Sequence, residues 1–428
     1  MNIDFLYSKF QEIQKVSIDT RKAINGSIFF CLKGPNYNGN DFAYEALKKG
    51  AEIVIIDEKQ ATNENKFLLV KDSLKCLQKL ATKHREKLNI PVLAITGTNG
   101  KTSTKDLIYD VLNKKFKIIK TIGNLNNHIG LPLSILSINK TLEFAVLEFG
   151  ASKIGDITEL CKIGKPNYGL ITNIGKAHLE EFGNVSNIII TKTELWRYLI
   201  KNNGSIFRNI EDKDLMNIIF NHKEFLNYNK FINYGTKKNK IHLCSGSPFL
   251  EFKWENELIK TKIVGEYNLN NIIASIAVGQ FFKVNRKNII KSLQQKSFNN
   301  NRSQLIKTDL NEIVLDAYNA NPTSMKLSIN SFINIKTTLE KILIIGDMLE
   351  LGKNSEKLHE ELIDFLKNEN IKNCILVGSI FNRIDCQFLK FINKQSLEDY
   401  LTKHKLEKNI ILIKGSRKMK LETLKEFL

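Results

Sequence analysis

The chain has 428 residues, of which 42% are hydrophobic and 25% charged, and this ordinary globular balance predicts two to four domains. Apolar runs too short to span a membrane, a first segment without the pattern of a signal peptide and six cysteines without a CxxC pair predict a cytoplasmic protein with neither a zinc knuckle nor a redox motif. The formal net charge of +19 allows a nucleic-acid partner, but lysines spread along the whole chain favour compositional drift with some steering of anionic substrates.

The first predicted domain covers residues 1–84. Ser27–Leu32 and Ala51–Asp57 are short apolar runs that predict strands, and a helix is expected near Asp41–Lys49 between them. This part of the chain is therefore predicted to be a small α/β unit.

The second predicted domain covers residues 85–300 and begins with a strand followed by a helix. Val92–Ile95 is an apolar run that predicts a buried strand, Gly97 and Gly100 form a turn, and apolar residues recur at helical spacing after Lys101. Further strands are predicted at Phe144–Gly150 and Tyr168–Gly175. Strands that alternate with helices indicate a parallel sheet covered on both faces.

The third predicted domain covers residues 301–428, after a linker at SFNNNRSQ. Helices are expected from Thr323, near Ser355–Lys367 and at the end of the chain. The predicted strands are Glu312–Tyr318, Lys341–Met348, Cys374–Ser379 and Asn409–Ser416. This alternation predicts a Rossmann-like open sheet, which binds ligands beyond the carboxyl ends of its strands. The fold class predicted for the whole chain is thus α/β, with a small N-terminal domain, a central parallel-sheet domain that carries a phosphate loop, and a C-terminal Rossmann-like domain.

The segment TGTNGKT (Thr96–Thr102) lies between a predicted strand and a predicted helix. Its glycines let backbone N–H groups point at phosphate oxygens, and the helix N-terminus adds the positive end of a dipole. Lys101 would reach the β- and γ-phosphates, and the Thr102 hydroxyl would bind Mg²⁺. The alternative is a glycine turn with an incidental lysine, but Gly-Lys-Thr at the start of a helix directly after an apolar strand favours a nucleotide phosphate loop.

Two further residues are candidate metal ligands. Glu148 ends an apolar strand, where a carboxylate can face the magnesium of a nucleotide, although it could instead be a surface residue at a strand end. His178 follows another predicted strand. A lone histidine is more often structural, but with a phosphate loop and Glu148 in the same domain an imidazole becomes a plausible ligand.

A series of motifs runs in order along the chain. They are SIDTR (Ser17–Arg21), GSIFFCLKG (Gly26–Gly34), TGTNGKTSTKD (Thr96–Asp106), GNLNNHIGLP (Gly123–Pro132), VLEFGA (Val146–Ala151), TNIGKAHLEEFG (Thr172–Gly183), TKTEL (Thr191–Leu195), GEYNLNN (Gly265–Asn271), NNRSQ (Asn300–Gln304), DAYNANPTS (Asp316–Ser324), GDMLELG (Gly346–Gly352) and KGSRKMKLE (Lys414–Glu422). Together they resemble the Mur ligases of peptidoglycan synthesis over essentially the whole chain. GNLNNHIGLP and DAYNANPTS are similar to the member that adds D-alanyl-D-alanine to UDP-N-acetylmuramoyl-tripeptide, and the DNPR selector of a sister ligase is not found.

The resemblance implies an ATP-dependent peptide ligase. ATP would phosphorylate the carboxylate of UDP-N-acetylmuramoyl-tripeptide, and the amine of D-Ala-D-Ala would attack the acyl phosphate and release inorganic phosphate. Two Mg²⁺ ions and Lys101 would neutralise the charges that crowd the reacting groups. The resemblance implies small-molecule substrates, no nucleic acid and no membrane insertion, and we expect a monomer.

The resemblance also assigns roles to residues. Lys101, Glu148, His178 and Lys192 would be catalytic, and Thr102 would join the last three as metal ligands. Lys192 would be carbamylated, which turns a cation into an anion that can bind Mg²⁺; otherwise it is an ordinary solvated lysine. The nucleotide would be bound by Gly97, Thr98, Asn99, Gly100, Lys101, Thr102, Ser103, Asn268, Asn271, Arg302 and Asp316.

Substrate-binding residues are implied in all three predicted domains: Ser17, Thr20, Arg21, Asn124, Asn127, Asn319, Asn321 and Ser324. Asp347, Lys414 and Arg417 follow strand ends and are candidates for orienting this region or binding anionic groups. For these C-terminal residues helix capping or loop structuring is the alternative, since Asn, Ser and Asp favour caps. The sequence departs from the family at Tyr267 and Asn40, where histidine is usual.

Several other functions remain open. The chain could be the sister ligase that adds the third residue of the peptide, or a folate or cyanophycin ligase, and amine preference separates these. A nucleic-acid-stimulated P-loop ATPase would show steep salt dependence of binding. The intact set of Lys101, Thr102, Glu148, His178 and Lys192 argues against a noncatalytic UDP-sugar-binding protein. Whether the acceptor carries diaminopimelate or lysine is not decided by the sequence.

Overall fold

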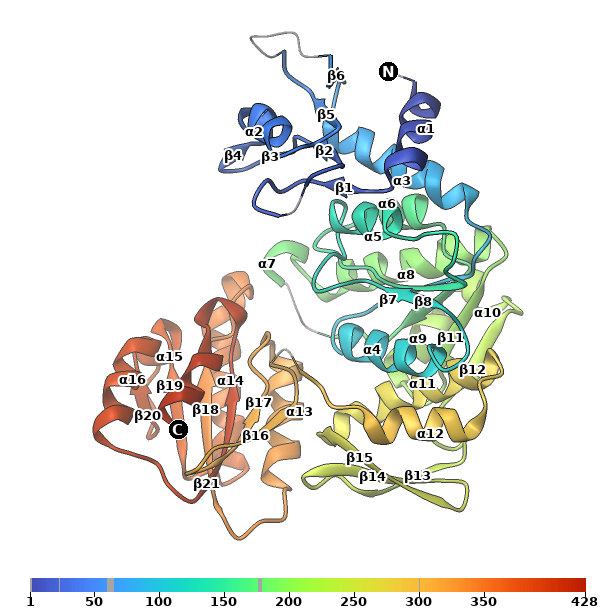
Figure 1. Ribbon diagram of the computed structural model, residues 1–428. Helices are drawn as coiled ribbons and strands as arrows, with labels where there is room; N and C mark the ends of the chain where they lie inside the picture. The colour runs from blue at the N-terminus through green and yellow to red at the C-terminus, as the bar shows by residue number, and fades with distance from the viewer. Residues whose placement is uncertain (1, 23, 60–64, 176–178, 300) are drawn as a thin grey trace. The chain divides into compact units, whose positions relative to one another are not determined.

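The computed structural model describes residues 2–22, 24–59, 65–175, 179–299 and 301–428 (Figure 1). By their internal contacts the residues form two compact units. Unit 1 comprises residues 1–96, 116–170 and 191–206, and unit 2 comprises residues 97–115, 171–190 and 207–428. Each unit is therefore assembled from segments that lie far apart in the sequence.

Unit 1 begins with a small parallel sheet of strand order β1-β2-β5-β6. The strands are β1 (Val16–Ser17), β2 (Ile28–Phe30), β5 (Ile53–Ile56) and β6 (Phe67–Leu69). The other elements are α1 (Ile3–Ile13), β3 (Lys33–Gly34), β4 (Tyr37–Asn38), η1 (Gly39–Phe42), α2 (Ala43–Lys48) and α3 (Ser73–Lys87). Phe29 and Val54 of adjacent strands share one core cluster with Ala43 and Ala46 of α2. The α/β unit predicted for this part of the chain is confirmed.

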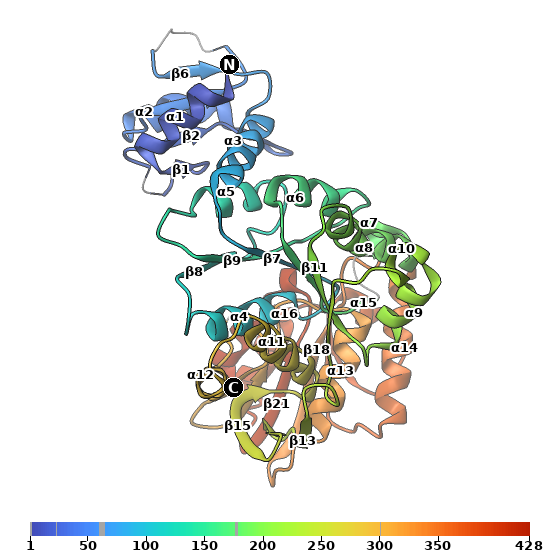
Figure 2. The same cartoon turned by 90° about the vertical axis from the view of Figure 1, so that its right-hand side faces the viewer.

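The rest of unit 1 contains parallel strands that are buried or partly buried. They include β7 (Val92–Thr96), β8 (Ile118–Lys120) and β9 (Phe144–Glu148). Every residue of β7 and β9 is buried, as expected of strands in a parallel sheet. Helices α5 (Gly130–Leu136) and α6 (Asp156–Gly164) lie on one side of these strands and pack against α3 (Figure 2).

The sheet that contains these strands has six members, in the order β12-β11-β10-β7-β9-β8. Its other strands are β10 (Tyr168–Ile171), β11 (Ser205–Asn209) and β12 (Phe231–Tyr234). Between β10 and β12 the chain forms α7 (Leu179–Phe182), α8 (Val185–Lys201), α9 (Lys213–Asn221) and α10 (Lys223–Leu226).

In unit 2, the helix α4 (Lys101–Leu112) packs against α11 (Leu269–Phe281) and α12 (Arg286–Gln295). A three-stranded antiparallel sheet, which the sequence analysis did not predict, lies against α12 (Figure 1). Its strands are β13 (Ile241–Ser245), β14 (Phe249–Trp254) and β15 (Glu257–Val264), and η2 (Glu266–Asn268) follows them. Buried and exposed residues alternate in the middle of β15, which is the pattern of a strand with one covered face.

The C-terminal part of unit 2 is built on a six-stranded sheet of order β16-β17-β21-β18-β19-β20. The strands are β16 (Gln304–Lys307), β17 (Glu312–Leu315), β18 (Glu340–Gly346), β19 (Cys374–Val377), β20 (Leu389–Phe391) and β21 (Asn409–Lys414). All its strand pairs are parallel except β16–β17. The helices are α13 (Pro322–Ile333), η3 (Gly352–Asn354), α14 (Ser355–Asn368), α15 (Ser379–Arg383), α16 (Lys394–Lys403), η4 (Arg417–Met419) and η5 (Leu421–Phe427).

Alternate residues along the strands of this sheet point to opposite faces, and helices cover both faces. Ile313, Ile344 and Ile411 pack in one cluster with Leu397 of α16 and Leu424 of η5. The intervening residues of the same strands are buried as well. Helices lie on both faces of the strands in Figure 1, so the predicted Rossmann-like sheet is confirmed.

Observed strands end earlier than predicted at the carboxyl edge of the sheets. The strand expected at Tyr168–Gly175 ends at Ile171, and that expected at Glu312–Tyr318 ends at Leu315. In both places the polar residues that follow leave the sheet and bond to other loops. The final helix is a 3₁₀ helix, η5.

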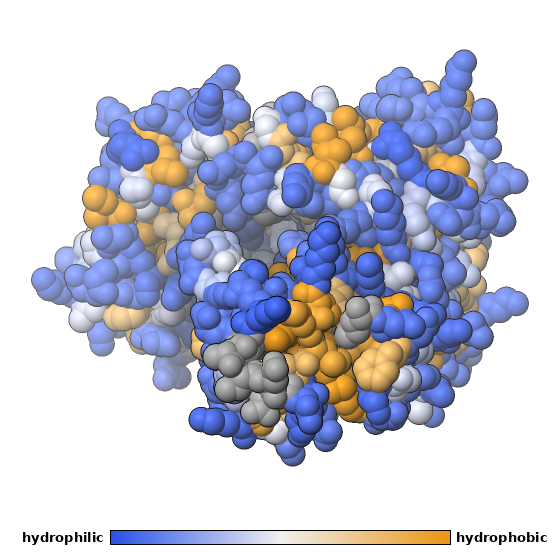
Figure 3. Space-filling view, turned by 90° about the horizontal axis from the view of Figure 1, so that it is seen from above, coloured by the Kyte–Doolittle hydropathy of each residue, from blue (hydrophilic) through white to orange (hydrophobic). Residues whose placement is uncertain are grey.

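Within the described residues, no helix is long and apolar enough to cross a membrane. Hydrophilic side chains cover most of the face drawn in Figure 3, and hydrophobic side chains form separate groups on it. This face therefore agrees with the charged, lysine-rich composition.

Candidate active site

The predicted phosphate loop is a tight turn between β7 and α4. Gly97 and Gly100 have φ angles of +137° and +78°, which side-chain-bearing residues rarely adopt. A Cβ on Gly97 would lie 2.1 Å from Oγ1 of Thr172, and a Cβ on Gly100 would lie 2.8 Å from Oδ1 of Asn271. Both the backbone conformation and the neighbouring side chains therefore require glycine.

The loop is braced by residues that follow β10. Thr98 donates its backbone N–H to the carbonyl of Asn173 at 3.0 Å. Asn99 donates its N–H to Oδ1 of Asn173, and its carbonyl accepts from Thr172 Oγ1 at 2.6 Å. Gly175 donates to the Thr98 hydroxyl at 2.9 Å. Sequence reasoning missed this role of Thr172 and Asn173, although TNIG directly after a strand was a signal for it.

Lys101 begins α4 and folds back over the loop. Its Nζ donates to the carbonyls of Gly97 and Thr98 at 2.8 and 2.9 Å. The ammonium group thus lies on the loop itself, where it can meet the oxygens of a polyphosphate. Thr102 and Ser103 are the next two residues of the helix, at its positively polarised end.

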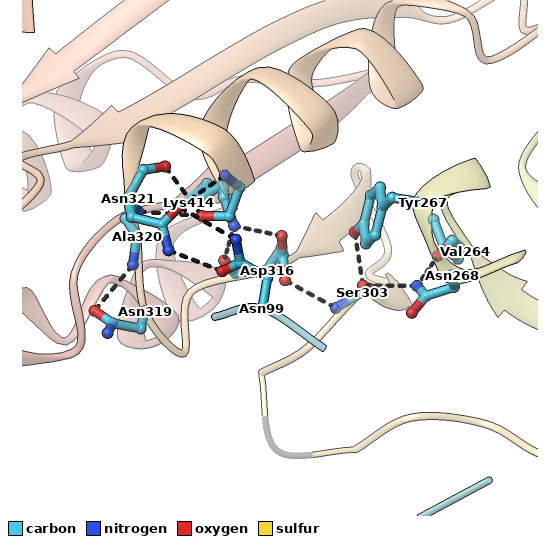
Figure 4. A network of polar contacts seen from close by, with 11 residues as sticks. Asn99, Val264, Tyr267, Asn268, Ser303, Asp316, Asn319, Ala320, Asn321 and Lys414 are labelled. Atoms are coloured by element: carbon cyan, nitrogen blue, oxygen red, sulfur yellow. Dashed lines mark hydrogen bonds and ion pairs between the residues drawn. The ribbon is translucent and has the colours of Figure 1, made fainter. Parts of the chain in front are cut away.

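A chain of side-chain hydrogen bonds leads away from α4, and Figure 4 shows its far end at Asn268, Ser303 and Tyr267. Thr104 donates its hydroxyl to Asn271, and Asn271 donates to Asn268 at 2.8 Å. Asn268 donates to Ser303 at 3.3 Å, and the Tyr267 hydroxyl lies 2.7 Å from the same Ser303 oxygen. Asn268 and Asn271, predicted to bind the nucleotide, are both buried, and here their amides join α4, α11 and the segment before β16.

Tyr267, at a position where the family usually has histidine, stays a neutral phenol. Burial, followed by the charge of Asp316, raises the pKa of Tyr267 well above its ordinary value. Its hydroxyl therefore remains available as a partner of Ser303 at any physiological pH. Ser303 itself has a φ of +45° and Asn301 one of +59°, so two residues with side chains adopt the left-handed conformation where the chain enters the third predicted domain.

Asp316, predicted to contact the nucleotide, is held at the end of β17. Its Oδ1 accepts the N–H of Ser303 at 3.2 Å, and its Oδ2 lies 2.6 Å from Nζ of Lys414. Lys414 is almost completely buried at the end of β21. The ion pair therefore joins two neighbouring strands to the segment that carries Ser303 (Figure 4).

The phosphate loop is also joined to the start of α13. Nδ2 of Asn321 donates to Oδ1 of Asn99 at 2.8 Å, and the reverse bond is 3.5 Å long. Asn321 is at the same time the N-cap of α13, because its Oδ1 accepts the N–H of Ser324 and the Ser324 hydroxyl accepts the N–H of Asn321. Asn319 bonds only to the neighbouring N–H of Ala320 among the described residues.

Two guanidinium groups lie against the ring of Tyr318, which follows Asp316 by two residues. Cζ of Arg302 is 3.5 Å from the ring centroid, and Cζ of Arg417 is 4.7 Å from it. Arg302, predicted to bind the nucleotide, thus belongs to the same part of unit 2 as Asp316.

In unit 1, Glu148 lies at the carboxyl end of β9, where Ile95 is its register partner. The phosphate loop, Thr96–Thr102, begins directly after Ile95. Nδ2 of Asn126 donates to Glu148 Oε1 at 2.9 Å, and the Glu148 N–H donates to Thr121. Asn126 was not predicted as a site residue, although it stands inside GNLNNHIGLP.

The predicted metal ligands are only partly described. Thr102 and Glu148 offer hard oxygen donors, which fit Mg²⁺. Lys192 is buried within α8, and His178 lies outside the described residues. Among the described residues, no group of three or more His, Cys, Asp or Glu side chains could hold a metal by itself.

The predicted substrate residues of unit 1 have local partners. Arg21 forms a two-bond ion pair with Asp19, and the hydrogen bonds from Arg21 lower the pKa of Asp19 to about 2. The Ser17 hydroxyl bonds to Asp19, and Thr20 is buried. Oδ1 of Asn127 accepts the N–H of Gly130 at the start of α5, and Asn124 is exposed. Asn40 donates to Asp57 at 2.8 Å.

Three family models match the chain in order. The model described as the Mur ligase family catalytic domain matches residues 12–92, and the Mur ligase middle domain matches residues 95–279. The model described as the Mur ligase glutamate ligase domain matches residues 301–417. The three-domain α/β fold expected from the sequence is therefore confirmed.

Relatives match the chain over nearly its whole length. The UDP-N-acetylmuramoyl-tripeptide–D-alanyl-D-alanine ligase of Bacillus subtilis is 32% identical over 424 residues, covering 96% of this chain and 92% of the relative. The crystal structure of MurF from Acinetobacter baumannii has a TM-score of 0.86 at 27% identity and covers 97% and 93% of the two chains. The MurF ligase of Thermotoga maritima, solved with ADP, has a TM-score of 0.83 at 30% identity and covers 97% of each.

Proposed function

This chain belongs to the Mur ligase family, and we propose that it uses ATP to join D-alanyl-D-alanine to UDP-N-acetylmuramoyl-tripeptide. The observation that carries the proposal is the hydrogen bond between Asn99 of the phosphate loop and Asn321 of the segment DAYNANPTS. A nucleotide held by the loop would lie beside the segment that resembles the dipeptide-adding members of the family.

The side chains of unit 2 fit the binding of a nucleotide polyphosphate. The loop offers backbone N–H groups and the Lys101 ammonium to the phosphate oxygens, and α4 adds its positive end. These groups would stabilise the charge that develops as the γ-phosphoryl group passes to the peptide carboxylate. Attack of the dipeptide amine on the acyl phosphate then forms the peptide bond and releases phosphate.

We infer that Thr102 and Glu148 bind Mg²⁺, with His178 and a carbamylated Lys192 as further ligands. Bound Mg²⁺ would polarise the phosphoryl oxygens and neutralise their charge. Asn126 would hold the Glu148 carboxylate in place through the bond at 2.9 Å. Lys192 is buried within α8, and carbamylation would turn its side chain into an oxygen-donor group that can bind Mg²⁺.

We further infer that each of the three parts of the chain binds one of the ligands. Residues 1–84 would bind the UDP-linked peptide with Ser17, Thr20 and Arg21, and residues 85–300 would bind ATP. Residues 301–428 would bind the dipeptide, with Asn319 as a candidate contact. We place the reaction in the cytoplasm, because ATP and UDP-linked precursors are cytoplasmic metabolites. We also expect the protein to be a monomer.

The test is phosphate release from ATP with UDP-N-acetylmuramoyl-tripeptide present and the amine varied. D-Ala-D-Ala, diaminopimelate, lysine and no amine form the four arms, and mass spectrometry identifies the product. We expect release only with D-Ala-D-Ala, together with a UDP-linked pentapeptide. Lys101→Met should abolish release, because it removes the cation of the phosphate loop.

Other outcomes would move the chain to a different function. Release with a diamino acid on the UDP-linked dipeptide precursor, and none with D-Ala-D-Ala, would indicate the sister ligase. Hydrolysis that needs no UDP-linked substrate and rises with added nucleic acid would indicate a P-loop ATPase.

A further inference from the structure

Three separate segments of unit 2 meet at the ring of Tyr318. Arg302 comes from the segment before β16, Tyr318 from the loop between β17 and α13, and Arg417 from the start of η4. The guanidinium of Arg302 lies 3.5 Å from the ring centroid, which is the distance of direct stacking, and that of Arg417 lies 4.7 Å away. One aromatic side chain therefore contacts two cations.

Neither arginine has a carboxylate partner in the part of the chain that the structure describes. Other arginines do have one, such as Arg21 with Asp19 and Arg286 with Glu255. The nearby Asp316 carboxylate is already paired with Lys414 at 2.6 Å. Two guanidinium groups held at one ring without a carboxylate partner repel one another, and a bound oxyanion would relieve that repulsion.

We propose that Tyr318 is a positioning residue that holds Arg302 and Arg417 as a two-guanidinium receptor for an oxyanion of the substrates. This inference rests on the proposed function for its ligands, a nucleotide phosphate or the carboxylate of the dipeptide. The family resemblance implies that Arg302 binds the nucleotide, and the structure adds the ring of Tyr318 and the guanidinium of Arg417 beside it. Guanidinium groups suit both kinds of oxyanion because they bind them with two parallel hydrogen bonds.

The face of the ring, and not its hydroxyl, carries the proposed role. Within the described residues the Tyr318 hydroxyl forms no hydrogen bond, whereas the backbone N–H of Tyr318 donates to Asn301. Tyr318→Phe keeps the face of the ring and should restore what Tyr318→Leu loses. This contrast separates stacking from any effect of the phenol.

The experiment measures ligand affinity and steady-state constants with the full chain. ADP and inorganic pyrophosphate are titrated calorimetrically, and KM and kcat are measured for ATP and for D-Ala-D-Ala. We expect Tyr318→Leu and Arg417→Gln each to lower the affinity for the bound ligand about three- to tenfold, which is the range of a lost cation–π contact or ion pair. The change in kcat should be smaller than the change in KM. Arg417 is exposed, so Arg417→Gln tests the receptor even where Tyr318→Leu folds poorly.

A double-mutant cycle and a matched control complete the design. If Tyr318 acts by holding Arg302 and Arg417, the variant with both substitutions should bind little worse than Tyr318→Leu alone. Phe231→Leu removes another ring that carries an arginine, Arg208 at 4.1 Å, and should leave the ligand constants of the site unchanged.

The two possible ligands give different results. Weakened binding of ADP and pyrophosphate identifies the nucleotide phosphates, and a raised KM for D-Ala-D-Ala with unchanged ADP affinity identifies the carboxylate. The proposal is overturned by wild-type constants in Arg417→Gln, by losses that add in the double variant, or by a Tyr318→Phe variant as weak as Tyr318→Leu. If no ligation occurs, the proposed function fails, whereas the ADP and pyrophosphate titrations still decide whether the receptor binds phosphates.

Discussion

The ion pair of Asp316 and Lys414 is a buried feature on which the candidate site depends. Its atoms are 2.6 Å apart, and only 2% of the Lys414 side chain is exposed. Removing one member of a buried pair leaves an uncompensated charge, whereas removing both does not. We expect Lys414→Met to lower the free energy of unfolding by about 3 kcal/mol, as urea denaturation would measure.

The double variant Asp316→Asn/Lys414→Met supplies the control for this prediction. It should be more stable than Lys414→Met alone, because no unpaired charge remains. Losses that simply add would show that the two side chains act independently.

The cysteines differ in reactivity for a physical reason. Burial raises the pKa of Cys31 to about 12 and that of Cys76 to about 11, so their reactive thiolate forms are scarce at pH 8. Cys244 is exposed. A thiol reagent should therefore modify Cys244 first in the native protein and the buried thiols only on unfolding, as peptide mapping would show. A rapid phase that survives in Cys244→Ser would contradict this.

At the residue scale, sequence could predict side chains whose role follows from a contiguous motif. Gly97, Gly100 and Lys101 are of this kind, because loop geometry depends on their immediate neighbours. Asn126 and Tyr318 were not predicted as site residues, since their partners Glu148, Arg302 and Arg417 are distant in sequence. Such roles arise only when folding brings the segments together.

At the scale of elements, the turn before α4 needs glycine at position 100 for two reasons. In Gly100→Ala, the alanine would have to adopt a φ of +78°, and its Cβ would lie 2.8 Å from Oδ1 of Asn271. The backbone strain alone costs about 1–2 kcal/mol, and the displacement of Asn271 should add to it. We expect at least tenfold weaker ADP binding, measured calorimetrically, because the loop can no longer hold its shape.

Gly183 is the matched control for this variant. Its φ is +75°, but no atom lies within 4 Å of an added Cβ. Gly183→Ala should therefore lose stability through strain and keep its affinity for ADP. Equal loss of affinity in the two variants would show that strain, and not the contact with Asn271, is decisive.

The start of α14 contains a histidine that makes stability depend on pH. Nε2 of His359 accepts the N–H of Met348 at 2.9 Å, and burial lowers the pKa of His359. The unfolded chain, with an ordinary histidine pKa of about 6.5, then binds the proton more readily than the folded chain. The contribution of neutral His359 to the free energy of unfolding is complete above a pH of about 6.5 and decreases as the pH falls below that value.

The melting temperature should therefore fall more steeply between pH 7.5 and 5.5 in the wild type than in His359→Gln, roughly the range around an ordinary histidine pKa. Glutamine can still accept from Met348 but does not titrate. Parallel melting curves for the two proteins would refute this assignment to His359.

Elements with long apolar runs were predicted well, and their ends were not. β7 and α4 were predicted because a buried run followed by helical periodicity has one interpretation. The sheet β13–β15 was overlooked, although β15 has the period-two pattern of a strand. Ends such as Ile171 and Leu315 are set by hydrogen bonds to other loops, which no local pattern records.

For the whole molecule, the net charge of +19 should raise the rate at which anionic substrates associate with the protein. Screening shortens the reach of charge to about 8–10 Å at physiological salt, so long-range steering weakens as salt rises. We expect kcat/KM for ATP to fall about threefold or more between roughly 0.05 and 0.3 M salt, with kcat nearly constant. A constant kcat/KM, or hydrolysis stimulated by added DNA, would contradict this view of the charge.

The bond between Asn99 and Asn321 also bears on how the protein ages chemically. Asparagine is a thermolabile residue, and one followed by glycine loses its amide most readily, through attack by the next backbone nitrogen on the side-chain carbonyl. Asn99 is followed by Gly100, yet the oxygen of its side-chain amide accepts a hydrogen bond from Asn321 at 2.8 Å, which restrains that amide. Deamidation would place a carboxylate in a loop built for phosphates, so the hydrogen bond that joins the loop to α13 should also slow the chemical loss of the site.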